Sequence, residues 1–177
     1  MQKQVHILAI AGSLREKSYN HGLLQAALEL SPPHCQLEIF DLKEIPLFNQ
    51  DHEKSLPPSV KHFKEKIRAA DGILLAVPEY NYSISGVLKN AIDWGSRPYG
   101  ENSWDGKPVA IMGASVGLLG TSRAQYHLRQ IFVTLNMYAL NKPEVMVSAA
   151  QDKFDANGRL TDEATRKRVG DLLTSLI

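Results

Sequence analysis

Residues 5–30, VHILAIAGSLREKSYNHGLLQAALEL, contain a complete strand–loop–helix unit. The run Val5–Ile10 is apolar except for His6 and predicts a strand, and the apolar residues of 23–28 recur at helical spacing. The loop between them collects hydroxyls, an amide and a guanidinium where the helix begins. A plain turn needs only Gly, Asn or Pro. The loop therefore predicts a site for an anion at a helix N-terminus.

The same alternation of strand and helix continues to the end of the chain. Further strands are predicted at 36–40, as an edge strand, and at 72–77, 109–114 and 144–148. Further helices are predicted at 60–70, 86–97, around 128–135, and after an N-cap at Thr161. The run 72–77, GILLAV, is apolar throughout, as in a central parallel strand buried on both faces. Five strands alternating with five helices predict a doubly wound parallel sheet with helices on both faces.

The composition limits the class of protein. At 177 residues the chain fits one domain, 1–177, and a formal net charge of +1 with no run of like charges argues against nucleic acid as a partner. The one cysteine, Cys35, excludes an internal disulfide and a multi-cysteine metal cluster. No apolar stretch has the length of a membrane span, and the N-terminal segment lacks a signal-peptide cleavage pattern. We therefore expect a cytoplasmic protein.

In such a sheet, ligands bind beyond the carboxyl ends of the strands, where the strand order reverses. The loop after the first strand has neither G-x-G-x-x-G nor G-x-x-x-x-G-K-[ST], so a Rossmann dinucleotide site and a Walker loop are both excluded. Its side chains Ser13, Arg15, Ser18 and Asn20 suit a phosphate monoester. The alternative is that Ser18 or Asn20 only caps the helix and that Arg15 is solvated.

Two further loops are predicted to lie at the same edge of the sheet. In PEYNYS (78–83), Tyr80 and Tyr82 flank Asn81 and can border a planar ring, although they can equally just cover the end of the sheet. GASVGLLGTSRAQ (113–125) is rich in small residues and allows backbone to approach a ligand, or it is a flexible turn. Together the loops predict a ligand with a phosphate at one end and a flat polar ring at the other.

The segments AGSLREKSYN (11–20), VPEYNYSISGVLKNAIDWGSR (77–97) and FDANGRLTDE (154–163) resemble the NADPH-dependent FMN reductase family. The resemblance covers 5–173 and implies a flavodoxin-like three-layer sandwich of strand order 2-1-3-4-5, with FMN as cofactor and NADPH or NADH as co-substrate. It implies a phosphate loop at Ser13, Arg15, Lys17, Ser18, Tyr19 and Asn20, a flavin-ring loop at Pro78, Glu79, Tyr80 and Asn81, and a third loop at Ser115 and Gly117.

One position departs from the family. Gly120-Thr121 stands where many members carry a Gly pair. We expect Thr121 either to narrow the approach to the pyrimidine edge of the flavin or to change the helix cap.

The sequence holds no acid–base pair, nucleophile or metal-ligand spacing, and its six histidines are scattered. This pattern agrees with a flavoenzyme, in which the cofactor performs the chemistry. The resemblance implies ping-pong transfer of electrons from NAD(P)H through the flavin to quinones, azo dyes, chromate or free flavin, with Tyr82 in the substrate pocket. Two alternatives remain open: a flavodoxin-type electron carrier, and a phosphate-binding module without a redox role.

The resemblance also favours a homodimer or homotetramer, and we expect the helix 86–97 to carry Trp94 near the shared surface.

Overall fold

The structure, a computed structural model, describes residues 4–177, so residues 1–3 of the predicted domain lie outside the described residues. Helices and strands alternate along the chain as the sequence predicts. In chain order the elements are β1 Val5–Ala11, α1 Tyr19–Glu29, β2 Cys35–Phe40, η1 Gln50–His52, α2 Pro58–Ala69, β3 Gly72–Ala76, α3 Gly86–Ser96, β4 Pro108–Ala114, α4 Ser122–Leu135, β5 Tyr138–Ala139, β6 Val145–Val147, η2 Ala150–Asp152 and α5 Glu163–Leu176.

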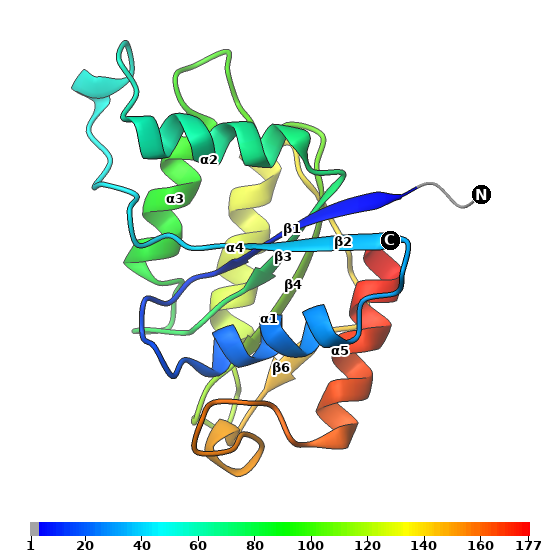
Figure 1. The fold of residues 1–177 in the computed structure, drawn as a ribbon. Helices are drawn as coiled ribbons and strands as arrows, with labels where there is room; N and C mark the ends of the chain where they lie inside the picture. Colours follow the sequence, from blue (N-terminus) through cyan, green and yellow to red (C-terminus); the bar gives the residue numbers. More distant parts are fainter. Residues whose placement is uncertain (1–3) are drawn as a thin grey trace.

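The strands form one parallel sheet in the order β2-β1-β3-β4-β5, with β6 also paired to β4. This confirms the predicted flavodoxin-like order 2-1-3-4-5 and places 36–40 at an edge. Helices α1 and α5 cover one face, and α2, α3 and α4 cover the other (Figure 1). The order reverses beside β1, because the chain moves from β1 to β2 on one side and then to β3 on the other.

The core explains why the central strands read as continuous apolar runs. All five residues of β3 are buried, and β1 is buried from Ile7 onward. Side chains of a strand alternate between the two faces. Ile7 and Ala9 accordingly pack with α1 and α5, while Leu8 and Ile10 pack with the helices of the other face. Neither face of these strands reaches water, which is what the run GILLAV predicts.

The fifth position of the sheet differs from the prediction of one strand at 144–148. It holds two short strands, β5 and β6, which pair with the two ends of β4. Pro143 lies between them and has no N–H to donate to a neighbouring strand. The pairing is therefore interrupted, and the two-residue β5 is too short to give a period-2 pattern in the sequence.

The helix caps follow the prediction with one correction. The N-cap of α5 is Asp162, not Thr161: its carboxylate accepts from Thr165 N at 2.8 Å and from Thr165 Oγ1 at 2.6 Å. The hydroxyl of Thr161 instead donates to Lys153 O.

The longest helices, α4 and α5, have 14 residues each. Within residues 4–177, none of the helices combines the length and apolar character needed to cross a membrane.

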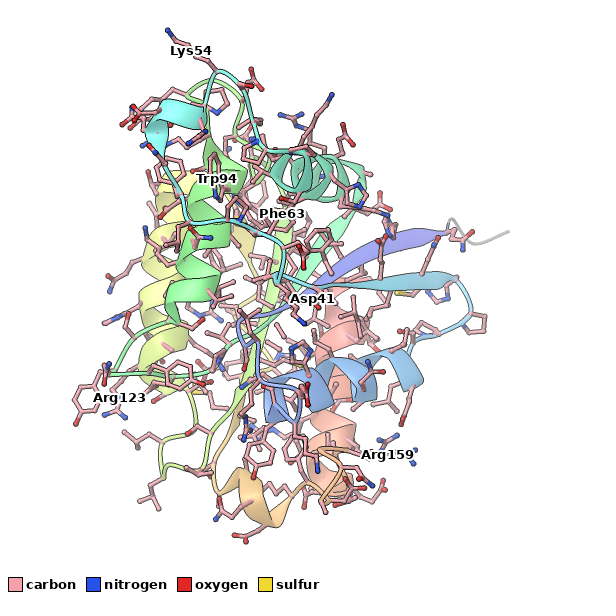
Figure 2. All side chains as sticks on the ribbon, turned by 60° about the vertical axis from the view of Figure 1, so that its left-hand side comes forward. Asp41, Lys54, Phe63, Trp94, Arg123 and Arg159 are labelled. Atoms are coloured by element: carbon pink, nitrogen blue, oxygen red, sulfur yellow. The ribbon has the colours of Figure 1, made fainter. Side chains whose placement is uncertain are left out.

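The expectation for Trp94 is wrong. Its side chain is fully buried, and its indole Nε1–H donates to Pro46 O at 2.8 Å. The ring of Phe48 meets the indole edge-on with 4.9 Å between centroids. Trp94, labelled on α3 in Figure 2, therefore packs against the irregular segment after β2 and holds that segment within its own chain.

Candidate functional site

Three loops meet at the carboxyl ends of β1, β3 and β4, beside the point where the strand order reverses. They enclose a pocket of about 640 Å³. Every predicted cofactor residue lines it except Ser13 and Lys17, and so does Tyr82. The full lining is Arg15, Ser18, Tyr19, Asn20, Pro78, Glu79, Tyr80, Asn81, Tyr82, Ala114, Ser115, Val116, Gly117, Leu119, Gly120 and Arg123.

The first loop is pre-organised by its own hydroxyls. Ser18 is the N-cap of α1, and its Oγ accepts from Asn20 N at 3.2 Å. Ser13 Oγ accepts from Arg15 N at 3.3 Å. Ser18 therefore performs the capping that the sequence left open. Capping does not exclude anion binding, because a serine hydroxyl that accepts a hydrogen bond still has a proton to donate.

The Asn20 amide has a partner inside the protein. Its Nδ2 donates to Ala114 O at 3.1 Å, and its Oδ1 accepts from Ala114 N at 3.0 Å. The side chain is buried. Both polar groups of Ala114 at the end of β4 are thereby satisfied, and the start of α1 is fixed against that strand. The Asn20 side chain thus connects the first loop to the start of the third loop.

Arg15 leaves its charge free. The side chain is exposed, and its Cζ lies 5.2 Å from the centroid of the Tyr19 ring. Tyr19 packs in turn on Phe154, with 4.9 Å between ring centroids. Within residues 4–177 no carboxylate forms an ion pair with Arg15. A guanidinium placed over an aromatic ring at a helix N-terminus is suited to a phosphate.

The second loop is a tight turn that projects two aromatic rings. Tyr80 and Ser83 exchange backbone hydrogen bonds of 3.0 Å in both directions. The two residues between them have positive φ, 50° at Asn81 and 66° at Tyr82, which is the geometry of a type I′ turn. A tyrosine rarely adopts this conformation. The turn leaves Tyr80 55% and Tyr82 65% exposed at the rim of the pocket.

Glu79 acts mainly on the start of α4. Its Oε2 accepts from the backbone N–H groups of Arg123 and Ala124 at 3.1 and 3.2 Å. Its Oε1 pairs with the Arg123 guanidinium at 2.6 Å. The Arg123 Cζ in turn lies 3.6 Å from the centroid of the Tyr82 ring. Arg123 is thus a pocket residue that the sequence analysis missed, because no motif within TSRAQ predicts its contact with a loop 44 residues away.

The third loop offers backbone and apolar side chains. Ser115 Oγ accepts from Gly117 N at 3.0 Å, and Val116 and Leu119 are exposed at the pocket. Gly120 has φ of 60°, and a Cβ there would lie 3.0 Å from the backbone of Met146. Only glycine meets both conditions without strain.

Thr121 does not line the pocket. It is fully buried, and its Oγ1 accepts from Gln125 Nε2 at 3.0 Å. It is the N-cap residue of α4, but its side chain makes no capping hydrogen bond, and Glu79 supplies the acceptor instead. Of the two expectations for this position, the placement favours a changed helix cap over a narrowed pocket.

Lys17 lies elsewhere. Its side chain lines a second cavity on the other side of the first loop, together with Arg15 and Ser18. Figure 2 shows Asp41 and Arg159, which belong to this second cavity, well apart from Arg123 of the pocket. Ser13 is buried within the first loop, where its Oγ accepts the hydrogen bond from Arg15 N.

Comparison with known proteins agrees with this geometry. The profile of the NADPH-dependent FMN reductase family matches residues 5–152. An NAD(P)H-dependent FMN reductase of Pseudomonas aeruginosa is 54% identical over 177 residues, which cover 99% of this chain and 95% of the relative. An NADPH:quinone oxidoreductase of Arabidopsis thaliana is 48% identical over 179 residues, with coverage of 97% and 90%. The solved structure of FerB, a flavoenzyme NAD(P)H:(acceptor) oxidoreductase of Paracoccus denitrificans, superposes with a TM-score of 0.88 at 34% identity, covering 97% of this chain and 94% of that one.

Proposed function

The chain belongs to the NADPH-dependent FMN reductase family and is therefore an oxidoreductase whose cofactor is FMN; from this premise we propose that NAD(P)H and quinones react in turn in the pocket at the ends of β1, β3 and β4. The observation that carries the proposal is the pocket itself, in which phosphate donors lie at one end and a turn with two exposed tyrosines at the other.

The residues present fit FMN at the phosphate end. Ser13 Oγ and Ser18 Oγ each accept a backbone hydrogen bond, so each hydroxyl proton is available for a phosphate oxygen. Arg15 brings a positive charge without a carboxylate partner in the described chain. We propose that these three residues, with the first N–H groups of α1, hold the phosphate.

The residues at the other end fit a flat polar ring. The turn at Tyr80–Ser83 and the backbone of Ser115 and Gly117 border the pocket from two sides. Asn81 and Gly117 both lie on exposed backbone that can address ring heteroatoms. When bound, FMN supplies hydride acceptance from NAD(P)H and electron transfer to the acceptor, chemistry that no side chain of the pocket provides.

Tyr82 and Arg123 form the proposed wall of the substrate side. The Arg123 guanidinium stacks on the Tyr82 ring and is itself paired with Glu79. Glu79 therefore fixes Arg123, and Arg123 in turn orients the Tyr82 ring. Exposed Val116 and Leu119 add apolar surface at the same opening. Such a surface favours a planar, weakly polar acceptor such as a quinone and disfavours water.

Steady-state kinetics test the proposal. If NAD(P)H and the quinone occupy the same opening in turn, double-reciprocal plots at several quinone concentrations should be parallel, and each substrate should inhibit competitively against the other at high concentration. Intersecting lines at every quinone concentration would show a ternary complex and contradict the one-pocket proposal. Azo dyes, chromate and free flavin are further proposed acceptors, which the same assay ranks against quinones by kcat/KM.

We further propose that the chain is one domain, 1–177, assembled into a homodimer or homotetramer in the cytoplasm. Light scattering at micromolar concentration measures the assembly directly. A monomeric mass in the presence of FMN would contradict it.

A further inference from the structure

A second cavity of about 490 Å³ lies against the outer side of the first loop. Its walls come from the loop after β1, from α1, from the segment just after β2 and from the turn that precedes α5. Arg15 and Ser18 line both this cavity and the FMN pocket. A ligand long enough to reach from one to the other would pass beside the phosphate loop.

The cavity is built by specific packing. The turn before α5 lies directly on α1, because a Cβ on Gly22 would come within 2.1 Å of Gly158 O. Glu29 on α1 pairs with Arg166 of α5 at 3.0 Å and with Arg159 of the turn at 3.3 Å. The hydrogen bond from Arg166, aided by Arg159, lowers the pKa of Glu29, so this carboxylate stays ionised. Two guanidinium groups balance its single negative charge.

The cavity lining has one more cationic side chain than carboxylates, and Glu29 is also paired with Arg166, so the net charge at the cavity favours an anion. The cationic side chains of the cavity are Arg15, Lys17, Lys43 and Arg159, and its carboxylates are Glu16, Glu29 and Asp41. Asp41 Oδ1 accepts a hydrogen bond from Lys43 N at 2.9 Å, which fixes the carboxylate on its own segment without removing its charge. Among the described residues, no carboxylate forms an ion pair with Lys17 or Lys43. Both ammonium groups are exposed and available to a ligand.

We infer that this second cavity receives the adenosine 2′-phosphate end of NADPH, with Lys17 and Lys43 facing the phosphate; the inference rests on the proposed function of the neighbouring pocket. NADPH and NADH share the nicotinamide that must reach the FMN ring, and they differ by one phosphate at the far end. Only the phosphorylated cofactor brings a dianion to match these two lysines. Leu14, 50% exposed in the same wall, offers apolar surface to the adenine.

The first test compares the two nucleotides on the FMN-loaded protein. Lys43→Gln should lower the ratio of kcat/KM for NADPH to that for NADH roughly fivefold, the upper range for one solvated ion pair, and Lys43→Glu should lower it further. The matched control is Lys54→Gln, because Lys54 is also exposed but lies at the opposite end of the molecule (Figure 2). The control should keep the parent ratio. An unchanged ratio in both Lys43 variants would overturn the inference.

The second test needs no turnover. Calorimetry on the FMN-loaded protein measures the binding of adenosine 2′,5′-bisphosphate. Lys43→Gln should bind it roughly fivefold more weakly than the parent does. The parent should bind adenosine 5′-monophosphate, which lacks the 2′-phosphate, more weakly than the bisphosphate by at least the same factor. The FMN absorbance should stay with the protein throughout. Displacement of FMN by the bisphosphate, or equal binding to parent and Lys43→Gln, would place the anion site in the phosphate loop and refute the inference. If neither NADPH nor NADH reduces the flavin, the proposed function is refuted. The calorimetry would still show whether the second cavity binds the 2′-phosphate.

Discussion

Replacing Arg15 by alanine should weaken FMN binding roughly tenfold. The guanidinium lies on the exposed loop before α1, 5.2 Å from the Tyr19 ring centroid, and within residues 4–177 it has no carboxylate partner. A hydrogen bond to a charged group is worth about 1.5–3 kcal/mol, and solvent screening at an exposed site favours the lower limit. About 1.5 kcal/mol corresponds to roughly a tenfold change in dissociation constant.

The assay is a titration of apoprotein with FMN, followed by quenching of flavin fluorescence, at low and at high salt. Salt should weaken binding to the parent more than binding to Arg15→Ala, because the variant has lost the screened contact. Arg15→Lys should fall between the two, since it keeps the charge but loses the planar fork. Arg68→Ala removes an exposed arginine from α2, remote from the pocket, and should bind as the parent does. Equal FMN affinity in the parent and Arg15→Ala would remove Arg15 from the phosphate site.

Three further predictions concern the pocket and the fold. Tyr82→Ala should raise KM for quinone more than the dissociation constant for FMN, since the ring lies at the rim and the phosphate loop anchors the cofactor; the reverse pattern would make Tyr82 a cofactor residue. Asn20→Ala should lower the free energy of unfolding by about 2–4 kcal/mol, because it leaves both buried polar groups of Ala114 without a partner; a loss below 1 kcal/mol in chemical denaturation would contradict this account. Asp162→Ala should cost about 1 kcal/mol at neutral pH through the lost cap of Thr165. The hydrogen bonds from Thr165 hold the pKa of Asp162 below its ordinary value of 3.8, so the difference between parent and variant should shrink as the pH falls below that value, and a constant difference would be inconsistent.

The parts of the fold that depend on local pattern were predictable from the sequence. The buried run of β3 and the helical spacing in α1 each report burial directly, and the alternation of strands and helices fixes a parallel sheet. The strand order itself came from the resemblance to a family, because alternation alone is compatible with more than one order. The split of the last strand position was missed, since β5 has only two residues.

The contacts between distant segments could not be predicted. Asn20 is an acceptable N-cap or ligand by sequence, yet its amide binds Ala114, 94 residues away. Glu79 lies in the predicted ring loop, yet its carboxylate caps α4 and orients Arg123. Trp94 lies on a helix with more apolar residues than one buried face needs, and the sequence does not show which segment covers its side chain. In the structure residues 46–48 cover it. Each case depends on long-range packing, which single-sequence patterns do not encode.

We propose that the pocket holds an FMN that NAD(P)H reduces. The most direct measurement is the visible spectrum of the FMN-loaded protein under anaerobic titration with NADPH, without any other acceptor. We predict loss of the oxidised-flavin absorbance with an end point of one NADPH per bound FMN, and its return when a quinone is added. A flavin that stays oxidised in excess NADPH and in excess NADH, while remaining bound, would contradict the account.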